Sequence, residues 1–124
     1  MSISRNFLVI GACYLVVGIV FGMYMGGSGD HTLAPVHAHI NLLGFTLMSV
    51  FGVLYRIIPA MSDSGLGKVH FWLYQIGVLA LLVALYLMMS GTIAAETIGP
   101  AMPVFEGMIL IGILSFVLNL FRSA

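Results

Sequence analysis

Charged residues are scarce in this chain, and their scarcity argues against an ordinary soluble domain. Lys, Arg, Asp and Glu together make up 6% of the 124 residues, and the mean hydropathy is +1.17. Soluble domains carry about 25% charged residues, so the composition predicts an integral membrane protein that contacts membrane lipid. The net charge is zero, which leaves no basic surface for nucleic acid.

Cysteine is almost absent, since Cys13 is the only one and lies within an apolar run. A single cysteine excludes an internal disulfide and any multi-cysteine zinc or iron–sulfur site within one chain. A small-residue cleavage motif is also missing after the first apolar run, which ends in the residues MYMGG at 23–27. We therefore interpret that run as a membrane span rather than a signal peptide.

Four apolar runs are each long enough to cross a bilayer core, which needs about 20 residues per helix. They cover residues 7–25, 35–58, 69–90 and 102–121. The connections at 26–34, 59–68 and 91–101 are rich in Gly, Ser, Thr and Pro, as helix-breaking segments are. The sequence predicts an all-α fold, with residues 1–124 forming one transmembrane four-helix domain.

Basic residues occur on only one side of the predicted spans. Arg5, Arg56, Lys68 and Arg122 fall at the two ends of the chain and in the second connection. The other side carries Asp30, His31 and Glu96 and no Lys or Arg. Because basic residues mark the cytoplasmic side, we expect both termini in the cytoplasm and a location in the bacterial inner membrane.

Two histidines, His37 and His39, begin the second run. On a helix, residues two apart point about 200° away from each other, so the pair is unable to face one ligand from one chain. Ionisable side chains at membrane depth usually mark a pathway, a proton relay or a cofactor. Neutral imidazole is a standard axial ligand of haem iron. Copper suits imidazole too, but one chain offers too few convergent ligands.

Three other residues are candidates for the same site. Gly44 lies about one turn below the histidines, where a missing side chain suits a flat macrocycle or close helix packing. Asn41 lies one turn below His37 and is expected to hydrogen bond there or between helices. Glu106 lies at the same external depth and is expected to accept an imidazole N–H or a proton, or else to reach the headgroups.

Other positions are expected to be structural. His70 begins the third span and is predicted to lie at the cytoplasmic headgroup level, with Trp72 as an interfacial anchor. Gly18 and Gly22, with Gly11 on the same stripe, predict close packing of the first helix against a neighbour.

The segment His37-Ala38-His39, followed by Leu43-Gly44-Phe45, resembles the ligand helix of haem–copper oxidase catalytic subunits. The likeness is greatest to C-type oxidases and the related nitric oxide reductases. The residues FGVLYRIIP at 51–59 and VHFW at 69–72 are similar to the end of that helix and the start of the next. The resemblance spans roughly residues 36–77, and beyond it only the number and order of helices agree.

The resemblance implies a particular assembly. The family subunit holds three pseudo-equivalent groups of four helices, and its His-x-His pair serves two haems, one on each face of the helix. This chain supplies one such group and lacks the separate copper histidines and the tyrosine that assists oxygen reduction. Closed cyclic symmetry lets identical subunits complete a site, which predicts a homotrimer of about twelve helices.

We expect haem b at each subunit interface near the external face, bound by His37 of one chain and His39 of the next. The expected role is electron transfer or binding of NO, CO or O2. The resemblance implies a protein related to oxidoreductases and leaves open whether it catalyses a reaction. An electron donor or an oxidase is the implied partner protein. The alternatives are a cofactor-free accessory or transport protein with pH-sensitive histidines, and a copper-binding membrane protein that uses His31 with the pair.

Overall fold

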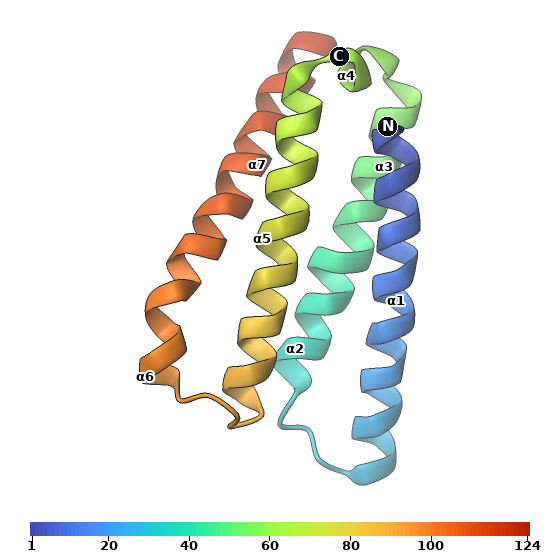
Figure 1. The fold of residues 1–124 in the computed structure, drawn as a ribbon. Helices are drawn as coiled ribbons and strands as arrows, with labels where there is room; N and C mark the ends of the chain where they lie inside the picture. Colours follow the sequence, from blue (N-terminus) through green and yellow to red (C-terminus); the bar gives the residue numbers. More distant parts are fainter.

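The computed structural model describes residues 1–124. The chain folds into four helical rods that lie side by side (Figure 1). The long elements are α1 (Ile3–Ser28), the second rod formed by α2 (Ala34–His39), η1 (Ile40–Thr46) and α3 (Leu47–Ile57), then α5 (Gly65–Met89) and α7 (Met102–Ser123). Three short elements connect them, namely α4 (Pro59–Asp63), α6 (Ala95–Ile98) and η2 (Gly99–Ala101). The predicted all-α fold is confirmed, and all four rods are long and apolar enough to span a membrane.

Two rods, α1 and α5, begin before the predicted apolar runs because a polar side chain caps the start of each helix. The Ser2 side chain accepts a hydrogen bond from the Arg5 amide and starts α1 four residues before residue 7. Gly29 ends α1 in the left-handed conformation, with φ of 74°, which glycine adopts without strain. Ser64 caps α5 in the same way by accepting from the Leu66 amide. Such caps satisfy amides that have no partner inside the helix.

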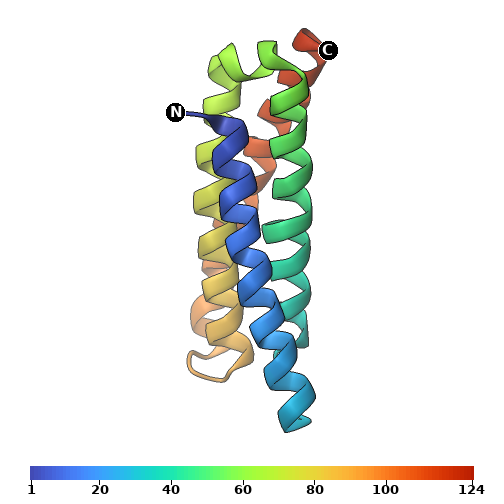
Figure 2. The same cartoon turned by 90° about the vertical axis from the view of Figure 1, so that its right-hand side faces the viewer.

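The rods are arranged so that α1 packs on the second rod and α7 packs on α5. Figure 1 shows α5 between α7 and the pair formed by α1 and the second rod, and both termini lie at the end of the bundle that also holds α4 (Figures 1 and 2). The opposite end holds α2 and α6. All four Lys and Arg residues therefore lie toward the end with the termini, and both candidate histidines lie toward the other.

An aromatic cluster fills the core in the half nearer the termini. Phe7 of α1 is fully buried, and its ring centroid lies 5.0 to 6.2 Å from those of five neighbouring rings. Those rings belong to Phe51, Tyr55, His70, Phe71 and Tyr74. Tilted and edge-on aromatic contacts add to the stabilisation from burial, so this cluster joins α1, α3 and α5.

Glycines allow α1 and the second rod to approach closely. A Cβ added at Gly11 would lie 3.1 Å from the Met48 Cβ. A Cβ added at Gly44 would lie 2.6 Å from the Tyr14 Cγ. The predicted close packing of the glycine stripe is confirmed, and Gly44 contributes to it from the opposite helix.

We predict that Gly44→Ala destabilises the protein by about 1–3 kcal/mol, because the added methyl group overlaps the root of the Tyr14 side chain. The matched control is Gly107→Ala in α7, where an added Cβ meets nothing within 4 Å. There the better helix propensity of Ala should stabilise by up to about 1 kcal/mol. Thermal unfolding of the two variants in detergent measures the difference. Equal midpoints for both would contradict the packing described.

Candidate haem site

The second rod changes its hydrogen-bonding pattern directly after His39. The segment η1 is a π-helix, and the Leu47 amide at its end donates to the Leu42 carbonyl, five residues back. Short π-segments are rare and occur frequently at functional sites. The segment contains both Asn41 and Gly44, so three candidate positions lie at or beside this irregularity.

His37 faces α1 of its own chain. Its ring lies over Gly22, where an added Cβ would be 3.2 Å from the imidazole Cε1. The Asn41 Nδ2 lies 3.3 Å from His37 Nε2 and donates to it, which assigns the imidazole proton to Nδ1. That Nδ1 is buried without a partner, as is the Asn41 Oδ1. The predicted contact between Asn41 and His37 is present.

His39 faces outward and is exposed. Its Nδ1 lies 2.7 Å from the Pro35 carbonyl oxygen, and Nδ1–H donates to that carbonyl. This hydrogen bond places the proton on Nδ1 and leaves Nε2 with a free lone pair. Metal-ligating histidines usually show the same arrangement, in which the second ring N–H donates to a carbonyl or carboxylate. In its neutral form, His39 thus presents Nε2 as the ring nitrogen available to a metal ion.

An exposed apolar stripe continues from His39 along the second rod. Its members are Leu42, Thr46, Val50 and Val53, spaced three or four residues apart. Leu42 and Thr46 lie within the π-helix η1, and all four side chains are exposed. His39 lies at one end of the stripe, and exposed Arg56 follows Val53 by three residues at the other end.

The two histidines lie on different faces of the second rod. We expect each face of the second helix to meet a neighbouring copy, but the His37 ring packs over Gly22 of α1 within its own chain. The space beside Gly44 is filled by the Tyr14 side chain of the same chain. The absence of a side chain at Gly44 therefore allows a helix contact rather than the binding of a macrocycle. His39 is the more exposed of the two imidazoles.

Glu106 does not orient either imidazole within the chain. It is exposed on α7, and the Pro35 carbonyl takes the His39 N–H in its place. His31 lies in the exposed connection, where Nδ1 contacts the Gly29 carbonyl at 3.1 Å. No three His, Cys, Asp or Glu side chains come together in a group able to hold a metal ion. A copper site made of His31 and the pair therefore has no preformed ligand set in one chain.

His70 is the residue that sequence reasoning misplaced. The sequence predicts a position at the headgroup level, but the side chain is fully buried, among the rings of Phe7, Phe51 and Tyr74. The Tyr55 hydroxyl and the His70 Nδ1 form a hydrogen bond at 2.9 Å. The sequence held a signal for this cluster, because Phe51 and Tyr55, like His70 and Tyr74, are four residues apart and share a helix face.

Comparisons with models of known protein families, with curated proteins and with solved structures found no match for this chain.

We predict that Tyr55→Phe destabilises the protein by about 1–3 kcal/mol, because it removes the hydroxyl and leaves the His70 Nδ1 buried without a hydrogen-bond partner. The control is Tyr24→Phe, since that tyrosine is exposed and its hydroxyl makes no hydrogen bond. Its effect should stay within about 0.5 kcal/mol. Thermal unfolding in detergent measures both variants, and an unchanged midpoint for Tyr55→Phe would show that the hydrogen bond contributes no stability.

Proposed function

We propose that this chain is a membrane protein that binds haem b on the outer face of its second rod, with His39 as the principal iron ligand. The observation that carries the proposal is the exposed imidazole of His39, held by the Pro35 carbonyl with Nε2 free. Bound haem would supply a redox-active iron able to take up a diatomic gas. The chain would supply the ligand, its orientation and an apolar surface.

The surroundings of His39 support a bound partner at this position. In membrane helices, ionisable side chains usually face the protein interior or a water-filled cavity. His39 instead faces outward, next to a stripe of aliphatic residues such as Leu42 and Val50. A porphyrin lying between this stripe and a neighbouring copy would cover both the imidazole and the apolar surface.

A second ligand would have to come from another chain. His37 of a neighbouring copy is the residue that the resemblance to haem–copper oxidases suggests. In the structure its Nε2 is engaged by Asn41 and its ring rests on α1, so ligation requires that hydrogen bond to break. We infer one strong and one exchangeable histidine ligand. This arrangement favours binding of NO, CO or O2 over simple electron transfer.

The distribution of charge supports a membrane orientation. Because all four Lys and Arg residues lie toward the end with the termini, we propose that this end is cytoplasmic, in a bacterial inner membrane. The haem then lies near the external face. A homotrimer would bring together about twelve helices by cyclic symmetry, which matches the family subunit that the chain resembles. Glu106, exposed at the same end, is available as a proton acceptor there.

We predict that protein purified after expression with a haem precursor shows a Soret band and that His39→Ala loses it. His37→Ala should keep most of the haem but alter its coordination, because His37 is the exchangeable ligand. His31→Ala, in the connection outside the site, is the control and should keep the wild-type spectrum. The ratio of Soret to protein absorbance measures haem content. A colourless wild type, or full haem content in His39→Ala, would refute the proposal.

We also predict that Asn41→Ala shifts the haem toward two histidine ligands, because it releases the His37 Nε2. Loss of one hydrogen bond of about 1 kcal/mol corresponds to about a fivefold change in the population with both ligands. Binding of CO should weaken by a similar factor, as measured by spectroscopic titration of the reduced protein. Asn6→Ala, near the opposite end of the bundle, is the control. Tighter CO binding in Asn41→Ala would contradict the role given to Asn41.

A further inference from the structure

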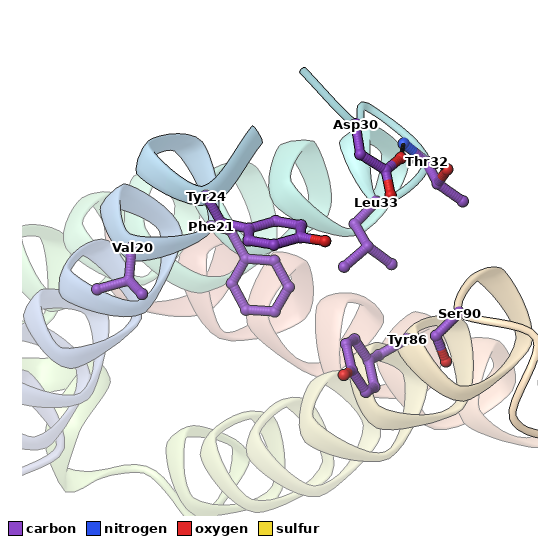
Figure 3. Close-up of a pocket in the computed structure, with 8 residues that line it drawn as sticks. All are labelled: Val20, Phe21, Tyr24, Asp30, Thr32, Leu33, Tyr86 and Ser90. Atoms are coloured by element: carbon purple, nitrogen blue, oxygen red, sulfur yellow. Dashed lines mark hydrogen bonds between the residues drawn. The ribbon is translucent and has the colours of Figure 1, made fainter. Parts of the chain in front are cut away.

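A cavity of about 580 Å³ opens between α1, the connection to α2 and the end of α5. Figure 3 shows three aromatic side chains around it, Phe21 and Tyr24 from α1 and Tyr86 from α5. Asp30, Thr32 and Ser90 line its polar side. The volume is in the range of small-molecule sites. Neither His37 nor His39 lines it, so it is separate from the proposed haem site.

A second cavity of about 280 Å³ adjoins the first and shares Phe21 and Tyr86 as walls. Its other walls are apolar or aromatic side chains, among them Val17, Leu79 and Leu82. The two cavities therefore lie next to each other along the α1–α5 contact. Together they offer a mixed polar and aromatic mouth beside a purely apolar space.

The mouth carries an ionised carboxylate. Asp30 Oδ1 accepts hydrogen bonds from the Thr32 hydroxyl at 2.6 Å and the Thr32 amide at 3.0 Å. These bonds, the hydroxyl first, lower the pKa of the Asp30 carboxyl. No residue lining the cavity is basic. The negative charge is therefore not neutralised within the cavity.

The aromatic rings complete an environment suited to a cation. Phe21 and Tyr86 meet edge to face, with centroids 6.1 Å apart and an interplanar angle of 89°. Aromatic faces attract quaternary and primary ammonium groups, most strongly where several rings surround the cation. A carboxylate beside three aromatic rings selects against anions. The apolar cavity behind the rings suits a hydrocarbon chain.

We propose that the two cavities form a binding site for an ammonium-bearing amphiphile. The ammonium head group lies between Asp30 and the rings of Tyr24 and Tyr86. The hydrocarbon chain enters the apolar cavity between α1 and α5, beside Val17 and Leu82.

Calorimetric titration of the purified protein with dodecyltrimethylammonium, in a neutral detergent, tests the proposal. Asp30→Asn should weaken binding at least tenfold, because it removes the carboxylate charge and keeps the shape. Glu96→Gln is the matched control, since it removes the same charge at the same end of the bundle outside both cavities, and it should bind as the wild type does. Unchanged binding in Asp30→Asn would overturn the proposal.

Two further arms separate the head group from the chain. Tyr86→Leu removes a ring shared by both cavities and should weaken binding even where Asp30→Asn fails to fold. Dodecanol, which has the hydrocarbon chain without the charge, should compete poorly with dodecyltrimethylammonium. Equal competition by dodecanol would overturn the proposal, because the site would then be an apolar groove without selectivity for the ammonium group. Competition by a short-chain phosphatidylcholine would identify the occupant as a lipid head group, whereas competition by tetradecylamine alone would identify a free amine.

Discussion

The close contact between α1 and the second rod is the constraint on which the positions of His37 and His39 depend. Gly18 and Gly22 present no side chains, so the Asn41 amide and the His37 ring occupy the space above them. This contact fixes the rotation of the second rod about its axis. With His37 turned inward, a residue two positions later must point away from α1, and His39 does so. The glycines of one helix thus determine which imidazole of the other is available to a ligand.

The consequence is that two residues of the same type have different chemistry. The His39 Nε2 is free because Pro35 holds the opposite ring nitrogen, whereas the His37 Nε2 accepts from Asn41 and its Nδ1 is buried without a partner. A buried polar atom without a partner is costly, so the inward imidazole is in a less favourable environment than the outward one. This difference between the two imidazoles supports the proposal that they are unequal ligands of a shared haem. The spacing of the two histidines along the chain does not predict that difference.

The four rods and the glycine contacts could be predicted from the sequence, because hydropathy and helical periodicity are local properties. The π-helix of η1 and the burial of His70 could not, since both depend on how the rods pack. Hydropathy treats His70 as polar and assigns it to the membrane surface. In the folded chain, Tyr55 supplies a hydrogen bond and the surrounding rings supply contact. The exposed position of Glu106 could not be predicted from the sequence either, because it depends on the packing of α7 on α5.

We propose that His39 is an outward ligand for haem shared between copies of this chain. Native mass spectrometry of the complex, released from detergent, tests this claim most directly because it reports stoichiometry and bound mass together. The account predicts a homotrimer that carries iron protoporphyrin, with the porphyrin released when the trimer dissociates. A single chain without added mass, from cells supplied with haem precursor, would contradict it.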